Sequence, residues 1–151
     1  MTRRLPLLAV LLLAMVVTPA GGQGPRDVSI DITSGGRRIR VQCESLVASG
    51  DRNARTVSVQ ADEVLAADLE TSAVFGVSRS WVAGQRPFDI QAVVGGKWVA
   101  SGSQVRLTGE VVDVPARRPI LIREYRGPLA EWRRLVHQFA DDVVLQFTGE
   151  P

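Results

Sequence analysis

The chain has 151 residues and a mass of 16.4 kDa, with 45% hydrophobic and 23% charged residues; this is the size and composition of one globular domain and argues against a multidomain protein. The formal charge is +2, but Arg3 and Arg4 lie in a segment that we expect to be removed, so the mature chain is neutral. Because nonspecific nucleic-acid affinity depends on clustered cations, this neutrality argues against a nucleic-acid partner.

Residues 1–22 have the three parts of a secretory signal peptide. Two arginines precede an apolar run from Leu5 to Val17, and the small residues after it predict cleavage behind Ala20 or Gly22. The apolar run is too short to cross about 30 Å of hydrocarbon as a helix, so no stable membrane anchor is expected after cleavage. The sequence therefore predicts an exported protein.

The predicted domain spans residues 27–151 and follows a flexible Gly- and Pro-containing lead-in over residues 23–26. Apolar and polar side chains alternate over residues 27–33 and again over 39–43, which predicts two half-buried strands. The polar run from Ser49 to Arg55 predicts a loop. Apolar residues then recur every three or four positions, which predicts a helix from about Val57 or Gln60 to Ser72.

The second half of the chain is predicted to hold four strands and one helix. The strands are expected over residues 74–81, 90–99, 104–114 and 120–125, and the Gly95-Gly96 pair predicts a bulge or a close backbone approach within the second of them. Gly127-Pro128 ends the last strand. The final helix has the strongest periodicity of the chain, with apolar side chains at Leu129, Trp132, Val136, Phe139, Val143 and Phe147, and Gly149 is placed to cap it.

This order of elements, with one apolar face on each helix, predicts an α/β (α+β) fold in which two helices pack on a mixed sheet of five to six strands. No nucleotide-binding glycine motif or paired-cysteine metal motif occurs, and no cofactor or metal is expected. The single Cys43 cannot form an internal disulfide and is predicted to be a buried thiol. A reactive thiol is the alternative, and a dyad with His137 has no support from the sequence.

Most polar residues that could carry chemistry have a simpler structural explanation. His137 is expected on the flank of the last helix, where Arg133 and Asp141 lie four residues to either side. The pairs Asp62-Glu63 and Asp141-Asp142 are expected on solvated helix faces rather than as a catalytic carboxylate pair.

The remaining candidates are a pair of arginines and three tryptophans. Arg117-Arg118 is expected in a solvated loop, with binding of a phosphate or of a partner's carboxylate as the alternative. Trp132 is expected in the core. Trp81 and Trp98 are expected to close over the core at strand ends, with a stacking surface as the alternative. The residues alone thus favour binding over catalysis.

Two segments resemble a known family, the N-terminal domain of TolB from the Tol-Pal cell-envelope system. Val64–Phe75 (VLAADLETSAVF) is similar to the first helix of that domain and the start of its next strand, and His137–Pro151 (HQFADDVVLQFTGEP) is similar to its last helix and Thr-Gly-Glu exit. The resemblance spans about Asp27 to Pro151. It implies a sheet with two helices like that of some anticodon-binding domains, without implying RNA binding, and it implies a periplasmic location.

The resemblance also implies the site and the partner. In the family, the first residues after signal cleavage contact the C-terminal domain of TolA. By position, that protein-binding segment corresponds here to residues 26–35, centred on Asp27, Val28, Ser29, Ile30, Asp31, Ile32 and Thr33. The implied role is a protein-interaction module of a system that serves cell-envelope integrity, protein import and cell division.

The chain departs from the family in two places. TolB continues past the Thr-Gly-Glu exit into a β-propeller that binds Pal, whereas this sequence ends at Pro151, so a Pal contact is expected only if a propeller is present elsewhere. The second strand leads into Val41-Gln-Cys-Glu-Ser45 rather than an apolar-Pro-Phe sequence.

Two alternatives to the protein-interaction role remain. They are a small structural domain that oligomerises through a sheet edge and a periplasmic hydrolase dependent on His137 or Cys43.

Overall fold

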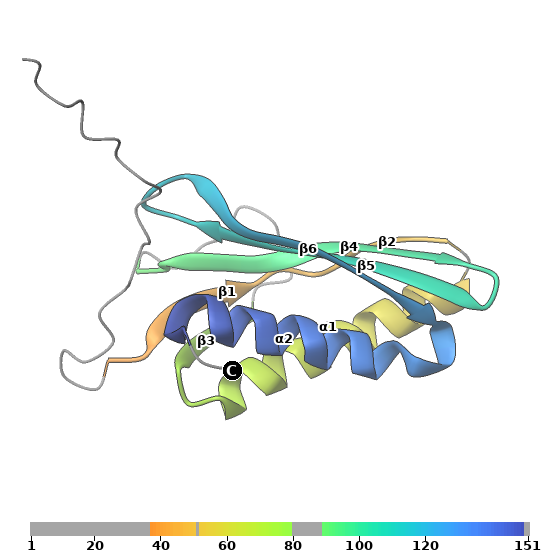
Figure 1. Cartoon of the computed structure of the whole chain (residues 1–151), viewed down its shortest axis with the longest axis horizontal. Helices are drawn as coiled ribbons and strands as arrows, with labels where there is room; N and C mark the ends of the chain where they lie inside the picture. The colour runs from red at the N-terminus through yellow and green to blue at the C-terminus, as the bar shows by residue number, and fades with distance from the viewer. Residues whose placement is uncertain (1–36, 51, 80–88, 150–151) are drawn as a thin grey trace, which may run out of the picture.

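The computed structural model describes residues 37–50, 52–79 and 89–149 (Figure 1). Its elements in chain order are β1 (Ile39–Cys43), β2 (Val47–Ser49), α1 (Arg52–Thr71), β3 (Phe75–Arg79), β4 (Ala92–Ser101), β5 (Gln104–Asp113), β6 (Arg118–Pro128), the 3-10 turn η1 (Leu129–Glu131) and α2 (Trp132–Thr148). The strand predicted over Asp27–Thr33, and Trp81, lie outside the described residues.

All six strands form one mixed sheet, as predicted. The order across it is β3-β1-β4-β5-β6, and β2 pairs with β4 beyond the end of β1. β1 runs parallel to β3 and β4, β2 is also parallel to β4, and the β4–β5 and β5–β6 pairs are antiparallel. The ten-residue β4 therefore pairs along one edge with β1 and then β2, which lie end to end. Along its other edge it pairs with β5, the first strand of the β5–β6 hairpin.

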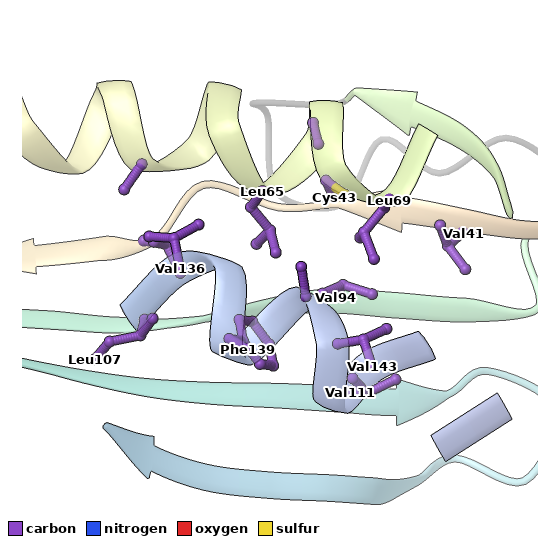
Figure 2. Close-up of a cluster of buried hydrophobic side chains, with 14 of the residues drawn as sticks. Val41, Cys43, Leu65, Leu69, Val94, Leu107, Val111, Val136, Phe139 and Val143 are labelled. Carbon is purple, nitrogen blue, oxygen red and sulfur yellow. The ribbon is translucent and has the colours of Figure 1, made fainter. Parts of the chain in front are cut away.

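Both helices cover the same face of the sheet, and no helix of the described residues lies on the other face (Figure 1). The core lies in this single interface, because every second residue of each strand points toward the helices. Figure 2 shows Val41 and Cys43 of β1, Val94 of β4 and Val111 of β5 facing Phe139 and its neighbours on the helices. Each of these side chains is at most 1% exposed. Burial of one sheet face and one stripe of each helix is the packing expected for this class.

The start of α1 differs from the prediction. The helix begins at Arg52 rather than near Val57, and it follows a short strand, β2, that the sequence did not indicate. Ala54 is completely buried in the first turn, so the core-facing residue of that turn is too small to stand out within a polar run. Gly50, at φ +134°, follows the end of β2. Glycine is needed there because a side chain would lie 2.9 Å from the carbonyl oxygen of Ala100.

In the β4–β5–β6 system, β4 and β5 lie close to their predicted bounds, and β6 extends beyond its predicted bounds at both ends. β4 pairs with β5 without interruption, and the irregularity of the sheet falls instead between Val111 and Val112 in the β5–β6 pair. The Gly95-Gly96 pair marks a close backbone approach. A side chain on Gly96, whose φ is +155°, would lie 2.1 Å from the carbonyl oxygen of Thr108, so glycine is required there.

The last helix agrees closely with the prediction. Pro128 ends β6, the turn η1 follows, and α2 continues to Thr148. Gly149 adopts a left-handed conformation with φ 73°, and its backbone N–H donates to the carbonyl oxygen of Leu145 at 2.8 Å. This is the capping role expected for a glycine directly after a helix.

Candidate protein-binding regions

The predicted protein-binding segment, Asp27–Thr33, lies outside the described residues, but its attachment point is described. The first described residue, Arg37, stands two residues before β1. β1 is an interior strand with β3 on one side and β4 on the other. The segment therefore joins a strand whose two edges are both occupied. Within the described part of the chain, the outer strands of the sheet are β6 on one side and β3 and the three-residue β2 on the other.

The edge strands β3 and β6 differ in length and in protection. β3 has five residues, and its last residue, Arg79, donates to Glu63 at 2.7 Å and to Glu70 at 3.0 Å. β6 has eleven residues and carries Pro119 near its start and Pro128 at its end. Prolines and charged side chains are common devices that discourage pairing with another chain.

Cys43 is confirmed as a buried thiol. Its side chain is 1% exposed, and burial raises its pKa to about 12. A thiol with so high a pKa is protonated at neutral pH and is a poor nucleophile.

His137 does not have the partners that the helix spacing predicted. Its Nδ1 lies 2.6 Å from Oδ2 of Asp68 on α1, instead of pairing with Arg133 or Asp141 within α2. The reason is that α1 and α2 pack side by side, so a residue distant in the sequence comes closer than those one helical turn away. The pair joins the two helices on their outer side, where the His137 side chain is 51% exposed.

The prediction that both acidic pairs face solvent is wrong for one member of each pair. Glu63 and Asp141 are exposed, but Asp62 is only 6% exposed. Its carboxylate accepts a hydrogen bond from the backbone N–H of Leu46 at 2.8 Å and another from Ser45. Burial outweighs these hydrogen bonds and raises the pKa of Asp62 to about 6. Asp62 thus fastens the β1–β2 connection to α1.

Asp142 is the second exception. It accepts a 2.6 Å hydrogen bond from the Tyr125 hydroxyl of β6 and lies 3.3 Å from a guanidinium nitrogen of Arg123. Burial and this hydrogen bond both raise the pKa of Tyr125. The cluster joins α2 to the sheet, so its role is structural.

The described tryptophans belong to the core. Trp98 is fully buried rather than closing the end of a strand, because β4 continues for three more residues, and it makes an edge-to-face contact with Trp132 at 6.5 Å between ring centres. Trp132 is 7% exposed, as predicted. Neither ring offers an open stacking face. The indole nitrogen of Trp98 is buried without a hydrogen-bond partner.

The arginine pair is divided between two elements. Arg117, at φ +53°, lies in the β5–β6 turn, whereas Arg118 begins β6 rather than a loop, and both are exposed. Among the described residues, no group of three or more His, Cys, Asp or Glu side chains is arranged to hold a metal ion. In the same part of the chain no helix is long and apolar enough to span a bilayer.

Comparison with known proteins gives a consistent result. No family model matches the chain. The Tol-Pal system protein TolB of Geobacter metallireducens is 26% identical over 99% of this chain, and that of Anaeromyxobacter dehalogenans is 29% identical over 95%. The chain spans only 38% and 36% of the lengths of these two relatives.

Solved structures show the same fold at low sequence identity. TolB from Acinetobacter baumannii superimposes with a TM-score of 0.59 at 17% identity, covering 76% of this chain and 29% of that protein. A PelC dodecamer from Paraburkholderia phytofirmans gives a TM-score of 0.53 at 14% identity, covering 68% of this chain and 83% of PelC. Over nearly its whole length the chain is therefore similar to the N-terminal part of TolB, as its sequence motifs indicated.

Proposed function

We propose that this chain is a periplasmic protein-binding domain of the Tol-Pal type that binds a TolA-like C-terminal domain through Asp27–Thr33. The observation that carries the proposal is the similarity to two TolB proteins over 95–99% of the chain. The signal-peptide pattern of residues 1–22 supports a periplasmic location. Pal enters only where a propeller accompanies the domain.

The proposed mechanism is addition of a strand. An extended segment with alternating side chains binds a partner's sheet edge through main-chain hydrogen bonds, and every second side chain supplies selectivity. In Asp27–Thr33 the apolar positions Ile30 and Ile32 would anchor the segment, and Asp27 and Asp31 would steer it toward a basic surface. Affinity is expected to be modest, because ordering a loose segment consumes part of the interaction energy.

A binding role rather than catalysis also agrees with the described residues that were candidates for chemistry. Cys43 is a protonated, buried thiol, and His137 is held by Asp68 on the helical side of the domain. Retained function in single Cys43→Ala and His137→Gln variants would support the binding role. Loss of function in either folded variant would favour the hydrolase alternative.

The direct test is titration of a TolA C-terminal domain into the mature chain by calorimetry. Deletion of Gln23–Thr33 is expected to abolish binding while circular dichroism shows an unchanged fold. The double variant Ile30→Asp/Ile32→Asp should also lose binding, whereas Ser29→Ala, on the opposite side of the alternation, should retain it. Unchanged binding by the folded deletion variant would refute the assignment of the segment.

A further inference from the structure

Positive charge collects at the end of the domain that carries the β4–β5 turn. We call this region the turn end; it comprises the turn at Gly102-Ser103, the neighbouring rows of β4, β5 and β6, the first turn of α1, and η1 with the first turn of α2 (Figure 1). Its basic side chains are Arg52, Arg55, Lys97, Arg106, Arg126, Arg133 and Arg134. The acidic side chains among the described residues of this end are Glu124 and Glu131.

The two carboxylates neutralise only part of this charge. Glu124 is shared by Arg126 and Arg106, and Glu131 pairs with Arg134 at 2.8 Å. Arg133 lies over the ring of Trp132, with its guanidinium carbon 4.5 Å from the ring centre. Neither Arg133 nor Arg52 makes an ion pair within the described part of the chain. Both are exposed, so they are available to a carboxylate from outside the domain.

Two hollows open beside these arginines. The larger, of about 500 Å³, lies between Val57 of α1, Ser103 of the turn, Pro128–Ala130 and Trp132. The smaller, of about 270 Å³, lies on the helix-free face of the sheet and is lined in part by Val99, Arg106 and Arg126. The walls of the larger hollow are mainly apolar, and Arg133 lies over the Trp132 ring that forms one of them. Protein interfaces commonly combine a buried apolar anchor with a polar rim, and arginine is enriched in them.

The shape and charge of the turn end select one class of partner. A membrane surface would require several protruding apolar side chains. Beside Lys97, Val47 of β2 is 66% exposed, but Trp132 is recessed and 7% exposed. Single-stranded nucleic acid would require an open aromatic face, but Arg133 covers one side of the Trp132 ring. A segment of protein with carboxylates next to an apolar side chain matches both the hollow and the unpaired arginines.

From these observations we infer that the turn end is a second protein-binding surface, which receives an acidic segment of a partner. The partner's carboxylates face Arg52 and Arg133, and an apolar side chain enters the hollow beside Trp132. Val41 of β1 pairs with Ala92, at the opposite end of β4 from Ser101. With a rise of about 3.3 Å per residue, Ser101 at the turn lies roughly 30 Å along the sheet from the level of Val41 in the strand that Asp27–Thr33 joins. The two surfaces can therefore bind different partners.

The test uses the mature chain and a fluorescein-labelled ten-residue peptide that alternates glutamate and leucine. Arg52→Glu/Arg133→Glu should weaken binding about tenfold or more at low salt, and the difference should shrink in 0.5 M NaCl. Both substitutions place a carboxylate in the first turn of a helix, where it is tolerated, so the variant is expected to fold. Arg117→Glu/Arg118→Glu makes the same charge change at the far end of β5–β6 and should leave binding unchanged.

Filling the larger hollow tests the apolar part of the inference. Ala130→Phe, at an exposed lining position, should weaken binding of the glutamate-leucine peptide but leave binding of an all-glutamate peptide unchanged. Equal weakening by the two charge-reversed variants would overturn the inference, as would absence of peptide binding. Binding to phosphatidylglycerol vesicles that is lost only in Arg52→Glu/Arg133→Glu would assign the surface to membranes and also overturn it. Deletion of Gln23–Thr33 should not affect peptide binding, which separates this test from that of the proposed function.

Discussion

At the residue scale, the least expected feature is a carboxylate buried beneath a strand connection. Asp62 has a folded-state pKa of about 6 against an ordinary value of 3.8. At pH values between 3.8 and about 6 the folded state binds more protons at this carboxyl than the unfolded state. The contribution of Asp62 to the free energy of unfolding therefore rises as the pH falls from 7 toward 4. Its ionised form destabilises the fold at neutral pH.

We therefore expect Asp62→Asn to raise the free energy of unfolding at pH 8, because asparagine keeps an acceptor for the Leu46 N–H without carrying a charge. A pKa that differs by roughly two units between the folded and the unfolded state corresponds to a change of at most about 3 kcal/mol in the free energy of unfolding. Urea unfolding between pH 4 and 8 measures the effect, which should be smallest at pH 4. Asp141→Asn, the same substitution at an exposed carboxylate of α2, is the control and should change little. A variant less stable than the parent at pH 8 would contradict this account.

A second prediction at this scale concerns the contact between Gly109 and Phe139. A Cβ atom added at Gly109 would lie 2.4 Å from the Phe139 ring. Gly109→Ala should therefore lower the free energy of unfolding by about 1–3 kcal/mol, the usual cost of overpacking a core, as measured by urea unfolding. Gly127→Ala, also in a strand, is the control, because the nearest atom to its added Cβ would be a Leu135 methyl at 3.4 Å, an ordinary contact distance. Equal effects of the two substitutions would indicate that the Phe139 contact is unimportant.

At the element scale, β6 is an edge strand protected by charge. Ile122 is 60% exposed on it, and the Glu124–Arg126 pair lies next along the same face. Glu124→Val/Arg126→Val would extend the apolar edge and should cause self-association in light scattering. Glu131→Val/Arg134→Val removes a similar ion pair away from the sheet and should leave the protein monomeric. A parent protein that is already dimeric would instead favour the alternative of a structural, oligomerising domain.

How well each element could be predicted depends on whether its buried residues can be recognised from the sequence. The periodicity of α2 and its Gly149 cap identified the end of the helix to the residue and its start to within about one turn, because its core side chains are large. The first turn of α1 was missed because Ala54, its buried residue, is small and surrounded by polar neighbours. The partners of His137 and Asp62 were missed for another reason: contact between helices, and between a helix and a strand connection, brings together residues that no local spacing relates.

At the scale of the whole molecule, the sheet order sets a hierarchy of local stability. β4 is paired on both sides over most of its length, whereas β2, β3 and β6 form the edges of the described sheet. Backbone amides that open only on global unfolding exchange slowest. Hydrogen exchange followed by NMR should therefore find the greatest protection in β4 and β5 and faster exchange in β3. Protection of β3 equal to that of β4 would contradict this ranking.

The position of the two described chain ends has a consequence for how the domain can be joined to other proteins. Phe147, near the end of α2, contacts Phe75 at 5.3 Å between ring centres, and Phe75 is the neighbour of Ile39 at the start of β1. The polypeptide thus enters and leaves on the same side (Figure 1). A fluorescent protein or an affinity tag fused behind Gly149 would extend from that side and leave the far side sterically open, so that surface immobilisation through such a fusion would present it to solution.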